Sequence, residues 1–509
     1  MALFDDAPQL YTNHSAGRLQ RRWLQALDEL GGCIRAVGDD PEPILCEGGN
    51  YPGSWIEGTG TISTEVLDRF APTVSRATHM TFARHCRADG LMPYKLTDDG
   101  PGFSQIQIVT PLARSVWKHY RLTGAPVTYL QTMYDAMTGM DAWLAANRDT
   151  RRTGGVEAFC TFDTGHDLSP RFWLIPDRCH DGDAARYDTG NPNLPYVAPD
   201  LTANVACQRR YLAKIAQELR RTPDFAQDDA TRLNALWEQC FDAADDCFYD
   251  RLPNDEFLRI QSDVLLRVLA CEVGDDAFFE RALDRYLMNT SKFLSPYGFT
   301  SLSLDDPRFD HDYTRNSWSG PVNFLAMLRA PQAFEDHGHV AELALVERSV
   351  LSAMLATDRF PQCLDPWTGS PGFTDHYSPA ILWLLDAVER NMGILPRPDG
   401  DIWFTGLATE PLTYTRTAGA VTYTMVCDGT GVQVAADGAP WLTFPAGWRV
   451  VVRDGDVRAV VGMSAGETMG TLTVRGVVTQ LTLPPNHIAH FSNGQLSDIQ
   501  TRGFITPHT

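Results

Sequence analysis

The chain has 509 residues, of which 43% are hydrophobic and 21% charged, and its net charge is −21. This composition is typical of a folded globular protein, and the length allows more than one domain. The negative charge disfavours binding to nucleic acid or to an anionic membrane. No apolar run approaches the roughly 20 residues that cross a bilayer. No signal peptide is visible at the start of the sequence.

Apolar residues recur at three- and four-residue steps through most of the first 392 residues. In the first such stretch, these steps join Leu19, Trp23, Leu24, Leu27 and Leu30. Helices are predicted at residues 18–30, 66–86, 106–120, 129–146, 201–219, 230–247, 257–270, 277–288, 340–356 and 379–390. Allowing for boundary errors, the pattern indicates about ten to twelve helices.

The connections between these helices alternate in length. Long segments rich in Gly, Pro, aromatic and acidic residues occupy residues 46–60, 91–103, 153–199, 297–321 and 360–378. Long loops in a compact domain usually carry function. Their recurrence on alternate connections predicts a ring of helices, an (α/α)6 toroid, whose loops meet around a central cavity. The alternative is an ordinary irregular helical bundle.

The pattern changes after residue 396, where short β-branched runs replace the helical spacing. The pairs Asp428-Gly429, Asp437-Gly438 and Asp454-Gly455 separate these runs in the manner of hairpin turns. The sequence therefore predicts a helical domain at residues 1–396 and a small β-sandwich at residues 397–509. The sandwich is either a structural module or a module that contributes to the edge of a sugar site.

The cysteines are scattered singly, without a Cys-x-x-Cys pair. This spacing gives little support to a zinc or redox site, so we expect reduced, buried thiols in a cytoplasmic protein. No Walker loop or Gly-x-Gly-x-x-Gly signature appears either. We predict that no cofactor and no metal ion are needed.

The segment 162–172 combines acids, a histidine and an arginine with a glycine turn and a Ser-Pro break. Such loops usually carry proton chemistry. The other long loops place aromatic residues and amides beside acids. Aromatic faces stack on pyranose rings, while amides and acids bind sugar hydroxyls, so the loops together predict a sugar-binding cavity.

Several short motifs resemble those of the trehalase-related (α/α)6-barrel glycoside hydrolases, which include processing α-glucosidase I. The closest resemblance, over about residues 45–392, is to the mannosylglycerate hydrolase-like group. The motifs are Trp55-Ile56-Glu57, Ser104-Gln105, Asp167-Leu168-Ser169-Pro170, Asp200-Leu201, Trp318-Ser319-Gly320-Pro321 and Asp365-Pro366-Trp367-Thr368-Gly369. The resemblance implies that Asp167 is the general acid and that Trp55 and Glu57 hold the sugar in the cleavage subsite.

Two positions depart from the family pattern. Ser319 replaces an arginine that contacts the sugar, and Gln362 occupies the position of the basic glutamate. Glutamine cannot take a proton from water, so the expected base is absent. Asp375 is the nearest candidate to replace it, with Glu57 in reserve. If Asp167 is not catalytic, it caps a turn or pairs with Arg171.

We therefore predict a glycosidase that cleaves a small, α-linked glycoside by inversion, with a small carbohydrate as its partner molecule and homo-oligomerisation left open. The predicted catalytic residues are Asp167 and Asp375. The predicted substrate-binding residues are Tyr51, Trp55, Glu57, Gln105, His166, Arg171, Trp318, Gln362, Trp367 and Tyr377. The alternatives are a non-hydrolytic enzyme in the same cavity (a lyase, an epimerase or a substrate-assisted enzyme) and a degenerate barrel that only binds carbohydrate.

Overall fold

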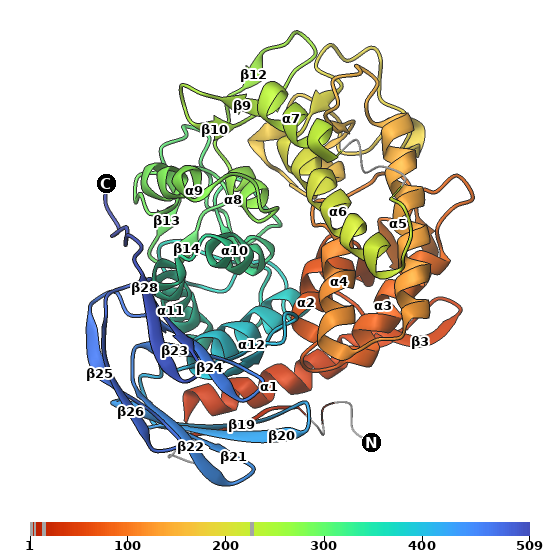
Figure 1. Ribbon diagram of the computed structural model, residues 1–509. Coiled ribbons are helices and arrows are strands. Elements are labelled where there is room, and N and C mark those ends of the chain that lie inside the picture. Colours follow the sequence, from red (N-terminus) through yellow and green to blue (C-terminus); the bar gives the residue numbers. More distant parts are fainter. Residues whose placement is uncertain (1–3, 5–6, 13–16, 224–228) are drawn as a thin grey trace.

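The computed structural model describes residue 4 and residues 7–12, 17–223 and 229–509. In this part of the chain, twelve α-helices come first and a long run of antiparallel strands follows (Figure 1). The helices are α1 (Arg18–Gly32), α2 (Ser63–Leu67), α3 (Pro72–Arg84), α4 (Leu112–Thr123), α5 (Val127–Asn147), α6 (Pro199–Glu218), α7 (Asp229–Cys240), α8 (Val264–Leu269), α9 (Asp276–Ala282), α10 (Phe324–Asp336), α11 (Val340–Ala356) and α12 (Ser378–Met392).

The even-numbered helices pack against one another in chain order. Contacts run from α2 to α4, α6, α8, α10 and α12, and α12 returns to contact α2. The odd-numbered helices α1, α3, α5, α7 and α11 pack against members of this series. Helices α6 and α12 are buried over most of their length, as expected for helices with apolar residues on several sides.

The observed helices differ from the predicted ones in several places. The predicted helix 230–247 is shorter, because α7 ends at Cys240 and two short strands follow. The stretch 66–86 is divided, because α2 ends at Leu67 and Pro72 begins α3, a position where proline is favoured. The stretch 257–270 contains a short strand and only a six-residue helix, α8. Helix α10 was not predicted, and it contains Pro331, a residue that normally interrupts a helical pattern.

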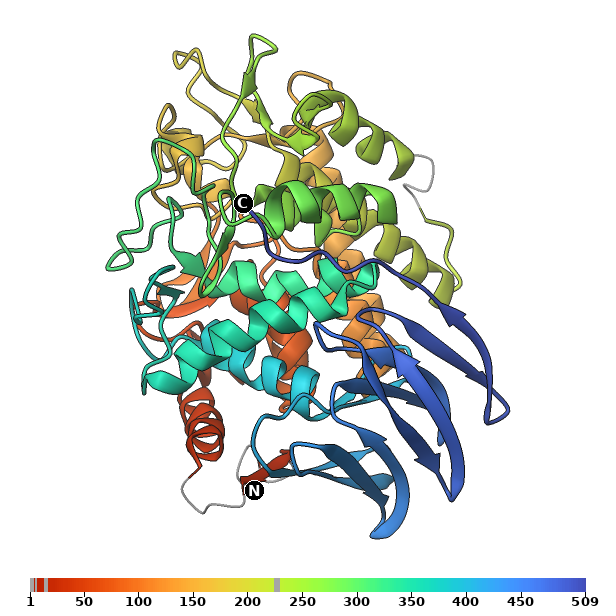
Figure 2. The ribbon, with the colours of Figure 1, turned by 90° about the vertical axis from the view of Figure 1, so that its left-hand side faces the viewer.

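Short strands brace the long loops between the helices. These strands are β2 (Ile34–Val37), β3 (Asp40–Leu45), β4 (Gly53–Trp55), β5 (Lys95–Thr97), β6 (Gly100–Gly102), β7 (Glu157–Ala158), β8 (Tyr196–Val197), β9 (Phe241–Asp242), β10 (Cys247–Phe248), β11 (Asp250–Arg251), β12 (Phe257–Leu258), β13 (Leu294–Ser295), β14 (Gly298–Phe299), β15 (Val322–Asn323) and β16 (Cys363–Leu364). Strand β4 pairs with β5 and β5 with β6, while β15 pairs with β16. Loops that are far apart in sequence are thereby held together, and Figure 2 shows many of them on the side away from the C-terminal sheets.

The remaining strands form two antiparallel sheets, in the orders β1-β19-β20-β21-β22-β25-β26 and β17-β18-β23-β24-β27-β28. Their bounds are β1 (Gln9–Thr12), β17 (Ile394–Pro396), β18 (Ile402–Thr405), β19 (Leu412–Ala418), β20 (Val421–Cys427), β21 (Gly431–Ala436), β22 (Ala439–Pro445), β23 (Trp448–Arg453), β24 (Asp456–Gly462), β25 (Thr468–Val474), β26 (Val477–Leu483), β27 (Ile488–Ser492) and β28 (Gln495–Gln500). The side chain of Phe404 in one sheet packs against Tyr423 and Trp441 in the other.

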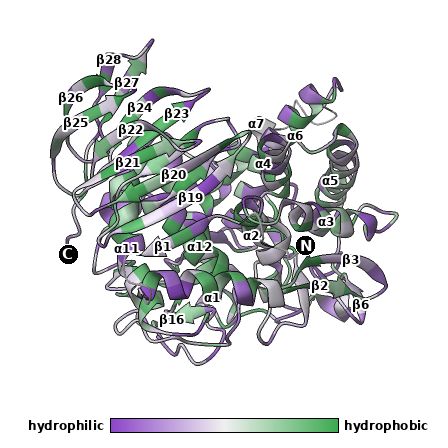
Figure 3. Ribbon diagram, turned by 90° about the horizontal axis from the view of Figure 1, so that it is seen from below, coloured by the Kyte–Doolittle hydropathy of each residue, from purple (hydrophilic) through white to green (hydrophobic). Residues whose placement is uncertain are grey.

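These sheets lie beside α1, α11 and α12, with hydrophobic and hydrophilic residues interspersed along the strands (Figure 3). The first strand, β1, pairs with β19 although it comes from the N-terminal end of the chain. The sequence pattern alone did not reveal this pairing, because a four-residue strand carries too little periodicity. In the described ranges, no helix is both long enough and apolar enough to cross a bilayer.

Candidate active site

A cavity of about 210 Å3 lies where the long loops meet. Each of the five long segments predicted from the sequence contributes to its wall or lies directly beside a contributor. The lining residues are Glu47, Tyr51, Trp55, Glu57, Tyr94, Lys95, Gln105, Gln107, Phe162, Gly165, Asp167, Arg178, Asn316, Leu325, Gln362 and Tyr377. The cavity therefore combines aromatic rings, amides and three carboxyl groups, a mixture that suits a sugar ring with its hydroxyls.

Asp167 reaches the cavity from a turn between two short 3-10 segments. Gly165 precedes it with a φ of +68°, and a Cβ there would lie 2.0 Å from Oε2 of Glu57. Leu168, which follows it, also has a positive φ, 61°, a conformation that costs free energy for a residue with a side chain. The backbone N–H of Trp318 donates to the Asp167 carbonyl at 3.0 Å. The turn is thus fixed from both sides.

The surroundings of the Asp167 carboxyl favour its neutral form. Burial, with the negative charges of Glu57 and Asp177, raises the pKa of Asp167 to about 7, against a hydrogen bond from Asn316 that lowers it. Arg171 does not neutralise this carboxyl. Its guanidinium binds Asp200 and Asp250 instead. A carboxylic acid that keeps its proton near neutral pH can act as a general acid.

A chain of hydrogen bonds connects Asp167 with Gln362 across the cavity wall. The Tyr51 hydroxyl donates to Oε1 of Gln362 at 2.6 Å, and Nε2 of Gln362 donates to Oδ1 of Asn316 at 2.9 Å. Nδ2 of Asn316 then donates to Oδ2 of Asp167 at 2.7 Å. Both ends of the Gln362 amide are therefore occupied, and the glutamine orients the asparagine that holds the acid.

Glu57 is the most strongly fixed carboxylate in the cavity. Nη2 of Arg329 donates to it at 2.8 Å, Nη2 of Arg267 lies 3.3 Å away, and Nε2 of Gln107 donates at 3.1 Å. Both arginines are almost completely buried. These contacts hold the Glu57 side chain in a fixed orientation, so Glu57 is suited to binding sugar hydroxyls.

Glu47 is the third carboxyl group of the cavity, and it was not singled out from the sequence. It follows β3 and is buried, with 4% of its surface exposed. Among the described residues, its side chain has no hydrogen-bond or ion-pair partner. Burial and the negative charges of Glu57 and Asp167 raise the pKa of Glu47 well above its usual value.

The structure brings together only part of the predicted site. Tyr51, Trp55, Glu57, Gln105, Asp167, Gln362 and Tyr377 all line the cavity, whereas His166, Arg171, Trp318, Trp367 and Asp375 do not. His166 is buried behind the turn, where Nε2 contacts Asp263 at 2.8 Å and Nδ1 contacts Arg171 at 2.8 Å. Burial lowers the pKa of His166 to about 4, so it is a neutral member of an internal network.

Two of the three tryptophans predicted to bind sugar lie elsewhere. Trp318 is 1% exposed and packs edge-on against His166, beneath the cavity wall. Trp367 is 48% exposed and projects from the loop after β16. The aromatic residues of the wall come instead from Tyr51, Trp55, Tyr94, Phe162 and Tyr377.

Asp375, the base proposed from the sequence, has its carboxylate committed to its own loop. Oδ1 accepts the backbone N–H groups of Phe360 and His376 at 2.8 and 2.7 Å, and Oδ2 lies 3.5 Å from Nε of Arg359. His376 beside it is exposed and contacts Glu29 of α1. This environment holds the loop in shape and leaves Asp375 outside the cavity.

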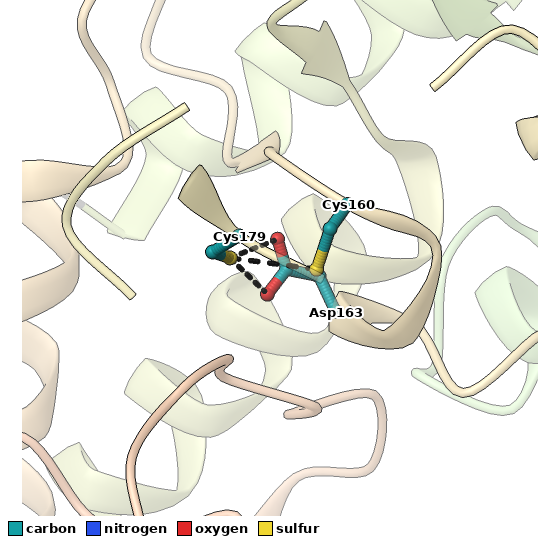
Figure 4. A group of neighbouring side chains, drawn as sticks. All are labelled: Cys160, Asp163 and Cys179. Carbon is teal, nitrogen blue, oxygen red and sulfur yellow. Dashed lines mark hydrogen bonds between the residues drawn. The ribbon is translucent and has the colours of Figure 1, made fainter. Parts of the chain in front are cut away.

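Asp163, four residues before the acid, also has a supporting role. Both its oxygens accept from Arg148, at 2.5 and 3.0 Å, and it further accepts the backbone N–H groups of Ile106 and Phe159. The thiols of Cys160 and Cys179 lie 3.4 Å apart beside it (Figure 4). Since the Arg148 guanidinium already balances the charge of Asp163, we interpret this group as an anchor for the loop that carries Asp167.

The sequence reading missed the cavity residues Glu47, Gln107, Asn316, Lys95 and Arg178. Asn316 belongs to a segment that was predicted to be a loop, but nothing in its spacing separated it from its neighbours. Gln107 fell within the helix predicted at residues 106–120, whereas α4 begins only at Leu112. Glu47 is followed by Gly48-Gly49, and this pair is a turn signal that could have directed attention to it.

A model of the mannosylglycerate hydrolase MGH1-like glycoside hydrolase domain matches residues 51–378. The structure resembles GH63 mannosylglycerate hydrolase from Thermus thermophilus in complex with Tris and D-glycerate, with a TM-score of 0.60, 17% identity, and coverage of 72% of this chain and 99% of that chain. It also resembles neutral trehalase Nth1 from Saccharomyces cerevisiae, with a TM-score of 0.54, 12% identity, and coverage of 68% and 73%. No curated protein sequence matches the chain.

The family match spans well over half of the chain, and the cavity with its three carboxyl groups lies almost entirely within the matched residues. The two structural neighbours share the fold at low sequence identity. The chain therefore belongs to the MGH1-like glycoside hydrolase family and is related to hydrolases that act on glycosidic bonds.

Proposed function

We propose that this glycosidase hydrolyses a small, α-linked glycoside with inversion of configuration, and that Asp167 is its general acid. The observation that carries the proposal is the Asp167 carboxyl itself, which faces the cavity with a pKa raised to about 7 and a fixed hydrogen bond from Asn316. Protonation of the leaving oxygen by such a group is worth about 10²–10⁴ in rate. A cavity of about 210 Å3 suits a single sugar residue and a small aglycone better than a polymer.

Two cations on the wall support a leaving group that carries negative charge. Lys95 lies 5.7 Å from the ring centres of both Trp55 and Tyr94, and Arg178 follows the acid loop. Neither forms an ion pair among the described residues. The T. thermophilus structure was obtained with D-glycerate, a small carboxylate. We therefore place glycosides of glycerate and related hydroxy acids first among the substrates to test.

We also infer that the two helical layers form an (α/α)6 toroid, because the contacts of α2, α4, α6, α8, α10 and α12 return to their starting point. The division into a helical domain of residues 1–396 and a β-sandwich of residues 397–509 remains a proposal, with β1 joining the sandwich. The sandwich has a structural role in this account, since no cavity-lining residue lies beyond Tyr377.

The test is a panel of α-glucosides and α-mannosides with neutral and carboxylate aglycones, followed by proton NMR of the first sugar released. We expect the β-anomer to appear first, and Asp167→Asn to abolish turnover while binding is retained. Lys95→Met and Arg178→Ala should raise KM for the carboxylate substrates alone. Release of the α-anomer, formation of an eliminated or epimerised product, or unchanged turnover by Asp167→Asn would contradict the proposal.

A further inference from the structure

The cavity lacks a carboxyl group at the position where the sequence motifs place the base. Gln362 stands there, and its amide is held at both ends by Tyr51 and Asn316. Asp375 accepts backbone N–H groups of its own loop outside the cavity. An inverting hydrolase nevertheless needs a second carboxyl group to activate water. That group must therefore come from another residue of the wall.

Glu47 lies on the Gln362 side of the cavity. The hydroxyl of Tyr51, four residues after Glu47, donates a hydrogen bond to Gln362. The ring of Tyr377 packs against that of Tyr51, with 5.8 Å between the ring centres. Glu47, Tyr51 and Tyr377 all line the cavity, and the charge of Glu47 raises the pKa of both tyrosines in addition to the effect of burial. Glu47 and Gln362 thus line the same cavity as Tyr51, the residue that binds the Gln362 amide.

The backbone holds Glu47 firmly in this place. Its N–H donates to the Gly53 carbonyl at 2.9 Å, and its own carbonyl accepts the N–H of Ser378 at 2.7 Å. At Gly58, an added Cβ would come within 2.5 Å of Oε1 of Glu47, so the absence of a side chain there makes room for the carboxyl.

The loop that contains Asp375 supports the turn after Glu47. Gly48 and Gly49 have φ values of +80° and +56°, and added Cβ atoms would meet the carbonyl oxygens of His376 and Asp375 at 2.2 and 2.4 Å. Only glycine permits so close an approach of two backbones. The 374–378 segment therefore positions Glu47, although the Asp375 carboxylate of this segment stays outside the cavity.

The other carboxylate of the wall is unsuited to the task. Glu57 is bound by the guanidinium groups of Arg329 and Arg267, and taking up a proton would leave these buried cations without their counterion. Glu47 has no such partner among the described residues, and it lines the cavity. Of the two glutamates, only Glu47 has a carboxyl group without an ion-pair partner among the described residues.

We propose that Glu47 is the general base of this enzyme and replaces the carboxyl group that Gln362 has lost. The assignment rests on the proposed hydrolytic function. The Glu47 carboxylate removes a proton from a water molecule, whose oxygen forms a bond to the anomeric carbon. The bond from that carbon to the leaving oxygen breaks, and the leaving oxygen takes its electron pair together with the proton of Asp167. The proton gained by Glu47 and the proton lost by Asp167 then re-equilibrate through solvent.

The charged and titratable groups that face Glu47 define its pH dependence. They are Glu57 after β4, Asp167 on the acid loop, and the phenols of Tyr51 and Tyr377. The anionic neighbours disfavour a further negative charge, so the pKa of Glu47 lies well above its usual value. Deprotonation of Glu47 sets the acidic limb of the plot of kcat/KM against pH, and deprotonation of Asp167 sets its basic limb. The two limbs should lie close together, so that kcat/KM is high only over a narrow pH range.

The experiment compares Glu47→Ala, Glu47→Gln and Asp375→Ala in the full-length enzyme, with and without sodium azide. Glu347→Ala is the matched control, because Glu347 is a buried glutamate of α11 that contacts Asn391 outside the cavity. We expect a loss of kcat of at least 100-fold for both Glu47 variants, and loss of the acidic limb for Glu47→Gln. Azide should restore turnover of Glu47→Ala and yield the β-glycosyl azide from an α-glycoside, because the small anion occupies the space of the water and the carboxylate.

Three results would overturn the assignment. They are activity within fivefold of wild type in Glu47→Gln, a loss in Glu47→Ala that azide does not restore, and azide rescue of Asp375→Ala in its place. Failure of the hydrolytic function itself looks different. In that case the wild-type enzyme releases no sugar from any glycoside, and Asp167→Asn has no effect. An active wild type, an inactive Asp167→Asn and an active Glu47→Gln would refute the Glu47 assignment alone.

Discussion

The substitution Gly165→Ala tests how closely the acid turn is fitted to the sugar-binding carboxylate. Gly165 has a φ of +68°, and an added Cβ would lie 2.0 Å from Oε2 of Glu57 and 2.9 Å from Nε2 of Gln107. A left-handed conformation costs about 1–2 kcal/mol for a residue with a Cβ. Displacing Glu57 by more than an ångström weakens charged hydrogen bonds worth about 1.5–3 kcal/mol. The total destabilisation should therefore be about 2.5–5 kcal/mol.

Gly182→Ala provides the matched control, because Gly182 has the same φ of +68° and nothing lies within 4 Å of its added Cβ. This variant should lose only the backbone term of about 1–2 kcal/mol. The assay is urea unfolding together with kcat/KM, which should fall about 100-fold in Gly165→Ala, as a misplacement near 1 Å predicts, and stay close to wild type in Gly182→Ala. Equal stability and equal activity of the two variants would refute the close fit.

Three further predictions concern the residues around the acid. Because the folded-state pKa of Asp167 is raised to about 7, its contribution to stability is present below pH 4 and lost as the pH rises through 7; Asp167→Asn should therefore raise Tm relative to wild type at pH 8 but not at pH 4, and an equal difference at both would contradict this. Arg148→Met leaves Asp163 charged and buried, so urea unfolding should show a loss of about 3–5 kcal/mol that Asp163→Asn partly restores; no recovery in the double variant would count against the pairing. Gln362→Glu removes the donor to Asn316 and adds negative charge near Asp167, so the basic limb of kcat/KM should move to higher pH, and an unmoved limb would contradict the connection.

The sequence predicted the architecture better than the identities within the site. Helical spacing and the change to β-branched runs indicated the helical region and the C-terminal sheets, because the spacing of apolar residues along each helix or strand is a local property of the sequence. Long loops rich in Gly, Pro and aromatic residues correctly located the segments around the cavity. Short-range motifs directed attention to Asp167 and Glu57, both of which line it.

The same motifs did not show where each side chain points or which residues it contacts. His166 and Arg171 stand next to the acid in sequence, yet they turn inward to Asp263, Asp200 and Asp250, which come from distant segments. Asp375 was favoured because it is an acid in the expected loop, but its carboxylate accepts nearby backbone N–H groups. Glu47 enters the cavity because two glycines let a distant loop approach, a tertiary contact without a local signature.

The proton supplied by Asp167 can be measured directly with leaving groups that differ in their need for it. The assay compares kcat/KM of wild type and Asp167→Asn on a glycoside with a poor alkoxide leaving group and on the α-glycosyl fluoride of the same sugar. Fluoride departs without protonation, so Asp167→Asn should lose about 10²–10⁴ in rate on the glycoside and far less on the fluoride. Equal losses on both substrates would show that Asp167 is not the proton donor.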